Sequence, residues 1–270
     1  MHFPKKNFRV SRAALFFLCS STLVVQSVAS FAEEESDDSG FNVKAGFDRT
    51  VGKYGQAKDT TISTRSLTIT YSDDDYSFDL ATPFVEQKGP GRLIFIPGRR
   101  PRVIAGPERQ VAGKGDVTLG GTKYLLNEED HGLDLDVGAI VKFGTGSYQK
   151  GLGSGENDYS LQSSASRSFG DFNLSLTAGY TFIGKPPTGN YQNAYYGSFD
   201  ASYKLTDSIR FGSTYSDGGT VVKGLSPSRD ITYYLDFRPL KSLKIEIYGL
   251  SGRSSQSPNR GGGVTVALDI

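Results

Sequence analysis

The sequence is poor in the side chains that carry most thiol and metal chemistry. Its 270 residues include one cysteine, one methionine, two histidines and no tryptophan. Cys19, Met1 and His2 all lie within the first 32 residues, so the rest of the chain holds only His131. A disulfide framework is therefore excluded from residues 33–270, and a zinc site built from several Cys or His ligands is excluded as well. We expect no cofactor.

The chain also lacks an excess of charge of either sign. It has 30 Lys and Arg against 29 Asp and Glu, which gives a formal net charge of +1 at pH 7. Loss of the four cations in the first 32 residues would change this charge to −3. A nucleic-acid surface needs a strong basic excess. We therefore expect no nucleic-acid partner.

The first 32 residues have the pattern of a secretory signal peptide. A basic opening is followed by an apolar run over residues 13–29 and by the small-x-small sequence Ser30-Phe31-Ala32. The apolar run is short and interrupted by polar residues, whereas a membrane-spanning helix needs about 20 apolar residues. Cleavage after Ala32 is therefore favoured over an uncleaved anchor. The bulky residues before Cys19 exclude a lipid-attachment site.

What the sequence has in abundance is alternation of apolar and polar residues. In Phe172 to Phe182, every second residue is apolar and those between are small or polar. This period of two predicts a strand with one apolar and one polar wall. We expect about twelve such strands. They are predicted near residues 41–50, 61–71, 76–86, 115–126, 132–143, 158–169, 172–183, 194–205, 208–216, 230–238, 243–251 and 261–270. In the fourth, the alternation changes phase near Gly120 and Gly121, which predicts a bulge.

The connections between these strands alternate in length. Short turns are predicted at residues 72–75, 127–131, 170–171, 206–207 and 239–242. Longer connections lie at residues 51–60, 87–114, 144–157, 184–193, 217–229 and 252–260. One end of the assembly should therefore carry tight turns and the other end long loops.

Three features indicate that the apolar wall faces lipid rather than a protein core. The polar wall carries charges of both signs, aromatic residues gather near both strand ends, and the strands match the 9 to 11 residues, approximately, that cross a bilayer. The alternative is a soluble secreted β protein. We predict an all-β fold: an antiparallel transmembrane β-barrel of about 12 strands in the bacterial outer membrane, with short periplasmic turns and long extracellular loops. Residues 1–32 would be the cleaved signal peptide, 33–40 an acidic periplasmic leader and 41–270 the barrel.

Three segments resemble one family of outer-membrane proteins. They are GKGDVTLGGTKYLL at 113–126, VKFGTG at 141–146 and KGLGSGENDYSLQSSASRSFGDFNLSLTAGYTFIG at 150–184. They are similar to the outer-membrane transporters of the phenol meta-pathway degradation (MetA-pathway) family. Gly144 stands where that family commonly has a proline, and Ile270 where many outer-membrane proteins end in an aromatic residue. The resemblance implies passage of small solutes, aromatic or apolar compounds among them, and assigns no residue to a substrate.

The inward wall predicts a narrow, charged lumen. Barrels of about eight strands are filled by side chains and those of about sixteen hold a wide pore, so twelve should lie between. The predicted lumen-lining residues are Lys44, Asp79, Asp134, Asp136, Lys142, Asp200, Lys204, Arg210, Asp236, Arg238, Lys244 and Glu246. Charges in a narrow lumen must pair, so we expect a network among the last seven of these residues.

The connection from Lys88 to Gln110 is the best candidate site. It combines an apolar patch, four prolines and five arginines: Arg92, Arg99, Arg100, Arg102 and Arg109. One hypothesis places this loop in or over the mouth of the barrel, where its guanidinium groups attract anions or lipopolysaccharide phosphates. The alternative is a solvated surface loop.

Other candidate chemistry is weaker. The glycine-rich stretch at residues 151–155 precedes a strand, whereas a dinucleotide-binding loop must open a helix. His131 sits in a short polar turn, which fits neither a metal site nor the serine-activating histidine of an outer-membrane phospholipase. The acidic turn at Asp73 to Asp75 could bind calcium, although solvated charge is the simpler interpretation. We therefore expect no enzyme activity.

Taken as a whole, the sequence predicts an outer-membrane channel or transporter for passive passage of small solutes. The alternative is a plugged structural or surface-interaction barrel that acts through its extracellular loops. The expected partners are a small-molecule solute, outer-membrane lipid and lipopolysaccharide, and the barrel assembly machinery that inserts such proteins.

Overall fold

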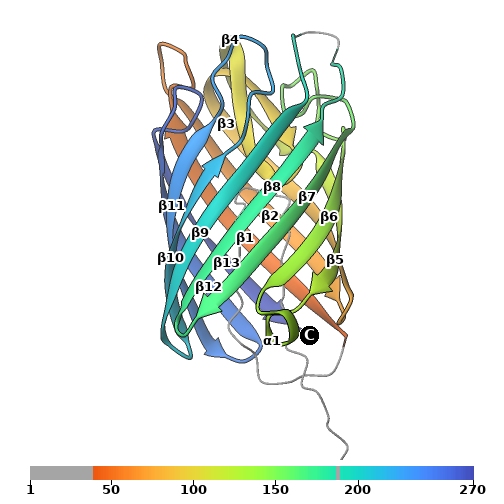
Figure 1. Ribbon diagram of the computed structural model, residues 1–270. Helices are drawn as coiled ribbons and strands as arrows, with labels where there is room; N and C mark the ends of the chain where they lie inside the picture. The colour runs from red at the N-terminus through yellow and green to blue at the C-terminus, as the bar shows by residue number, and fades with distance from the viewer. Residues whose placement is uncertain (1–38, 187–188) are drawn as a thin grey trace, which may run out of the picture.

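A computed structural model of the protein describes residues 39–186 and 189–270 (Figure 1). The predicted signal peptide, and the predicted leader up to residue 38, lie outside the described residues. No helix in the described part is long and apolar enough to span a membrane.

The described residues form thirteen strands and one short helix in a single antiparallel sheet. The elements are β1 (Gly40–Gly52), β2 (Thr60–Ser72), β3 (Tyr76–Ile96), β4 (Arg99–Lys114), β5 (Val117–Leu126), α1 (Glu128–His131), β6 (Asp134–Phe143), β7 (Asp158–Phe169), β8 (Phe172–Phe182), β9 (Ala194–Thr206), β10 (Ile209–Asp217), β11 (Arg229–Leu240), β12 (Leu243–Gly252) and β13 (Arg260–Asp269).

The sheet closes into a barrel. Neighbouring strands pair in chain order from β5 to β13, β13 pairs with β1, and the β1–β2 and β2–β3 pairings complete the ring. β3 pairs with β5 through Tyr76–Ala81 and with β4 through Phe84–Pro90, so β4 and β5 together act as one interrupted wall strand. The wall therefore has twelve strand positions in the described chain, and the prediction of a closed antiparallel barrel of about twelve strands is confirmed.

The two walls of each strand differ as the alternation predicted, with the apolar wall outside. In β8, the Leu176 side chain is 58% exposed, whereas Ser175 and Thr177 are 2% and 4% exposed. Large exposed hydrophobic residues also cover the outside of the other wall strands, while threonine, serine and aspartate side chains are buried inside. An apolar outer surface of this extent suits acyl chains rather than water, which excludes the soluble alternative.

The barrel has two unlike ends. Figure 1 shows α1 and the C-terminus at one end and the β3–β4 connection at the other. The described chain begins beside its end, since the Ile270 amide donates to the Phe41 carbonyl at 2.8 Å. The predicted turn before His131 is one turn of helix, capped by the Asn127 side chain, which accepts from the Asp130 amide, and closed by Gly132 in the left-handed conformation.

Two local predictions were wrong. The connection at 87–114 is not an extended loop, because β3 continues to Ile96 and pairs with β4 as a hairpin. The bulge predicted at Gly120 lies instead between Tyr124 and Leu126. Gly120 stays in register opposite Asp79, and a Cβ atom there would lie 2.5 Å from the Asp79 carboxylate, which would have to move.

Candidate functional site

The β3–β4 hairpin leaves the barrel wall and enters the lumen. We call residues 90–107 the inserted hairpin. At its tip, a Cβ on Gly98 would lie 3.1 Å from Ile140 of β6 and 3.9 Å from the Tyr196 hydroxyl of β9. The neighbouring Arg100 reaches Asp48 of β1. One tip can contact β1, β6 and β9 together only from inside the barrel.

The bend that directs the hairpin inward depends on glycine. Gly89 and Gly91 have φ angles of +126° and +107°, which L side chains rarely adopt. A Cβ on Gly91 would also lie 2.3 Å from a Val103 methyl group. The pairing of β3 with β4 shifts register next to this position, between Pro90 and Arg92. The local sequence therefore sets the direction of the hairpin.

Both faces of the inserted hairpin are packed. One face places Leu93, Phe95 and Val103 in a buried cluster with Tyr54, Ile62, Val85 and Leu152. The other face places Ile94 and Ile96 against Ala194 and Val221. Burial of an aliphatic or aromatic side chain of this size stabilises by about 1.5–3 kcal/mol. The hairpin is thus held by packing on two sides and is part of the folded interior.

Arg100 links the tip to the wall through compensated charge. Its Nη1 lies 3.2 Å from Asp48 Oδ2, and its Nε lies 3.9 Å from Asp230 Oδ1. The guanidinium stands 5.4 Å from the ring centre of Tyr248, whose hydroxyl donates to Asp48 Oδ2 at 2.7 Å. The positive charge of Arg100 is therefore balanced by its immediate neighbours, two carboxylates and an aromatic ring.

Arg99 and Arg102 are held differently. The Arg99 guanidinium donates to the Gly218 carbonyl and to Thr181 Oγ1, and it stacks on the Tyr196 ring at 4.4 Å. Arg102 donates to the carbonyls of Gly218 and, at 2.8 Å, Gly219. Within residues 39–186 and 189–270, no carboxylate forms an ion pair with either guanidinium. Their partners are neutral.

The electrostatic state of these two arginines follows from burial. Arg99 and Arg102 are 6% and 7% exposed. Burial removes water from around both guanidinium groups. Asp217 acts on both groups at longer range, but no carboxylate of the described residues forms an ion pair with either of them.

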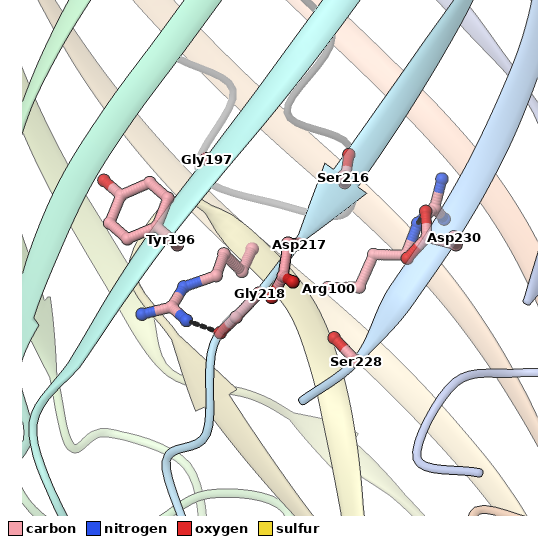
Figure 2. A pocket seen from close by; sticks show the side chains of 9 residues that line it. Arg100, Tyr196, Gly197, Ser216, Asp217, Gly218, Ser228 and Asp230 are labelled. Atoms are coloured by element: carbon pink, nitrogen blue, oxygen red, sulfur yellow. Dashed lines mark hydrogen bonds and ion pairs between the residues drawn. The ribbon is translucent and has the colours of Figure 1, made fainter. Parts of the chain in front are cut away.

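A pocket opens beside the tip of the hairpin (Figure 2). It is a small hollow that is partly open to solvent. Its lining residues are Arg99, Arg100, Tyr196, Gly197, Ser216, Asp217, Gly218, Ser228 and Asp230. Figure 2 shows Arg100 directed toward Asp230. Arg99 also lines the pocket and donates to the Gly218 carbonyl. The pocket is therefore lined both by an arginine that pairs with carboxylates and by one that pairs with none among the described residues.

The carboxylates of the pocket already have cations. Asp217 Oδ2 accepts from Arg229 Nε at 2.7 Å, and its other oxygen accepts from the Gly219 amide at 2.8 Å. Asp230 shares Arg100 with Asp48. Neither acid neutralises Arg99 directly.

The remaining predicted mouth residues hold the β6–β7 connection. Arg92 stacks on Tyr148 at 4.1 Å and donates to its carbonyl, and Arg109 donates to the Lys150 carbonyl at 3.0 Å. The Leu93 amide donates to the Gly151 carbonyl of the same connection. The five arginines predicted as one group thus have three separate placements.

Lys142 belongs to a closed cluster near the hairpin. Its ammonium group lies 2.9 Å from Asp116 Oδ2, 3.1 Å from Asp158 Oδ2 and 2.6 Å from Ser154 Oγ. The Lys142 and Asp116 side chains are 0% exposed. Asp116 and Asp158 were not among the predicted site residues, although each stands at an inward position beside a strand start. The cluster joins β6, the β4–β5 junction and the β6–β7 connection.

The predicted lumen residues all lie on the inward side. Asp79, Asp134, Asp136, Lys142, Asp200, Arg210, Asp236 and Glu246 are buried, and Lys44, Lys204, Arg238 and Lys244 are half-buried. The register aligns Lys204, Arg210, Asp236 and Glu246 on consecutive strands, and Lys244 lies 3.1 Å from Asp236. Asp200 instead accepts from the hydroxyl groups of Thr214 and Tyr234. That these residues line a solute path remains a prediction.

His131 and the acidic turn have ordinary surroundings. His131 is exposed at the end of α1, and Asp73 accepts from the amides of Asp75 and Tyr76 within its own turn. Among the described residues, no group of three or more His, Cys, Asp or Glu side chains is arranged to hold a metal ion.

Comparison with known proteins gives a family and a fold. A family model described as "Putative MetA-pathway of phenol degradation" matches residues 36–270. The KdgM porin is 12% identical over 85% of this chain and 99% of its own, with a TM-score of 0.50. The NanC porin is 9% identical over 85% of this chain and 100% of its own, with a TM-score of 0.53. No curated protein matches. At these identities the two porins show the barrel fold alone.

Proposed function

Because the chain belongs to the family described by the MetA-pathway of phenol degradation, and because its fold is an outer-membrane barrel, we propose that it is a channel for passive passage of small solutes. The observation that supports this most is the inserted hairpin, which narrows the lumen at one level and leaves a polar pocket beside its tip. A fixed constriction of this kind would limit the size of the solute. The proposal includes no covalent step.

The class of solute is part of the same proposal. The family description supports aromatic compounds as solutes. The inward wall is rich in hydroxyl groups, carboxylates and cations, and its apolar side chains gather in clusters around the inserted hairpin and at Tyr234, Tyr248 and Leu250. This composition disfavours pure hydrocarbons. We therefore expect aromatic compounds that carry a hydroxyl or charged group, together with other small polar solutes. The twelve inward charged residues named above would line the path.

The cellular setting is also proposed. Export with cleavage after Ala32, a leader at residues 33–40 in the periplasm and insertion by the barrel assembly machinery follow from the signal-like N-terminus and the barrel fold. Exposed rings such as Phe172 and Tyr195 near opposite ends of the wall suit the two membrane interfaces. Lipopolysaccharide would surround the end that carries the hairpin.

A plugged structural barrel is the second candidate. It is favoured by one observation: both faces of the inserted hairpin are packed, and the Lys142 cluster fixes the adjoining connection. In that case the extracellular connections would carry the function.

Liposome swelling separates these two candidates. Purified full-length barrel is reconstituted and exposed to uncharged sugars of increasing size, which do not cross lipid unaided. A channel with a fixed constriction should give swelling with arabinose that falls steeply for disaccharides. Swelling no faster than in protein-free liposomes for every sugar would contradict the channel and support the plugged barrel.

A further inference from the structure

We infer that Arg99 and the pocket that it lines form a binding subsite for small organic carboxylates, with Arg102, which donates to the same Gly218 carbonyl, contributing a second positive charge. Its role in transport rests on the proposed channel, whereas the binding itself does not. The subsite differs from a general attraction of anions to the mouth, because the structure separates the arginines whose charge is balanced from those whose charge is not.

Arg99 and Arg102 have buried N–H donors without hydrogen-bond acceptors among the described residues. A guanidinium has five N–H donors in a fixed fork. The Nε atoms of Arg99 and Arg102 are buried and have no hydrogen-bond partner in the described structure. Leaving a buried donor on a cation without an acceptor is unfavourable. A ligand oxygen at the pocket-facing Arg99 edge would remove this penalty.

The positive charges of Arg99 and Arg102 are not paired with carboxylates of the described residues. Arg100 shares two carboxylates, whereas the partners of Arg99 and Arg102 are carbonyl and hydroxyl oxygens. Asp217 and Asp230 face the same pocket, but they are paired with Arg229 and Arg100. An anionic ligand would supply the missing negative charge.

The guanidinium groups of Arg99 and Arg102 are held rigidly. The bonds to Gly218, Gly219 and Thr181 fix the two guanidinium planes before any ligand arrives. The Tyr196 ring covers one face of Arg99, so a ligand must approach along the edge of the fork. A carboxylate accepts two parallel N–H bonds from such an edge. Preorganised donors bind with a smaller entropic penalty than flexible ones.

The lining of the pocket indicates which ligand could carry the carboxylate. The pocket is lined by the Ser216 and Ser228 side chains and the Tyr196 ring, and it is partly open to solvent. The carboxylate would occupy the pocket, and a small ring or short chain would extend through the open side. Benzoate therefore serves as the probe. Phenol has the same ring without the carboxylate, and benzylamine has the opposite charge.

Calorimetric titration of the detergent-solubilised full-length barrel tests the subsite. Benzoate should bind saturably, phenol at least about tenfold more weakly because a charge-assisted pair is lost, and benzylamine not detectably. Arg99→Gln and Arg102→Gln should each weaken benzoate binding about tenfold or more. Arg99→Lys, which keeps the charge and loses the fork, should fall between. Arg65→Gln, on the outer face beside Glu86, is the matched control and should leave binding unchanged.

Heat-modifiable gel mobility shows which variants have folded, and Arg99→Lys provides a conservative substitution if a glutamine variant does not. Equal binding of benzoate and phenol, or unchanged benzoate binding in folded Arg99→Gln, would overturn the subsite. Benzoate binding without liposome swelling would overturn the channel and leave the subsite standing. Swelling without benzoate binding would do the reverse.

Discussion

At the scale of single residues, the interior treats its cations in two ways. Lys142 is enclosed by two carboxylates and a hydroxyl group, and Arg100 lies between Asp48 and Asp230. Arg99 and Arg102 have only neutral partners. Complete compensation suits residues that hold the fold together. Incomplete compensation beside an open pocket suits residues that meet a ligand.

Replacement of Lys142 tests this distinction. Lys142→Met would leave Asp116 and Asp158 facing each other without a cation in a buried site. We expect the free energy of unfolding to fall by about 3–5 kcal/mol, the usual effect of removing one partner of a buried ion pair. Urea unfolding of the reconstituted barrel measures this change.

Lys204→Met is the matched control for that experiment. Lys204 pairs with Asp207, whose side chain is 97% exposed, so its loss should change stability by at most about 1 kcal/mol. Equal stability of the two variants would show that the Lys142 cluster does not hold the fold.

At the scale of single elements, each wall strand is a boundary between lipid and lumen. In β8, the side chains of Leu174, Leu176 and Ala178 lie on one face and those of Ser175 and Thr177 on the other. The strand crosses the membrane once, and Leu176 lies near its middle. The orientation of the strand therefore depends on which face is apolar, and the effect of a substitution depends on the depth of the residue in the membrane.

A charge on the outer face tests that orientation. Leu176→Arg places a cation near the middle of the wall, and we expect a loss of about 2–4 kcal/mol of stability in lipid. Leu205→Arg, near the short-turn end of β9 and 55% exposed, should lose only about 0–1 kcal/mol because the interface hydrates the charge. Urea unfolding in lipid vesicles provides both values. A larger loss at Leu205 than at Leu176 would contradict the assigned depth.

The elements also show what a sequence can and cannot predict. β8 was predicted at residues 172–183 and occupies Phe172–Phe182, because strict alternation leaves one assignment. The inserted hairpin was predicted as a loop, because Leu93 to Ile96 are apolar on both faces and the flanking prolines and glycines resemble a connection. Its importance was recognised from its arginines. Their separate roles depend on Asp48, Thr181, Gly218 and Asp230, which only closure of the barrel brings near.

At the scale of the whole molecule, the barrel wall and the inserted hairpin together determine the shape of the lumen. We expect twelve wall strand positions to make a lumen wider than that of an eight-stranded barrel, and the inserted hairpin packs inside the barrel wall. Inward charges from Lys44 to Glu246 line the other levels. We propose that small solutes pass along a narrow polar passage through this lumen.

Single-channel conductance in planar bilayers tests that claim most directly. The wild-type barrel is compared with a variant in which residues 91–107 are replaced by a short Gly-Ser turn, with heat-modifiable mobility confirming that both have folded. We expect a small, steady conductance for the wild type and a severalfold larger one for the shortened variant, because the shortened variant lacks the constriction. Absence of conductance in the folded wild type, or equal conductance in the two proteins, would contradict it.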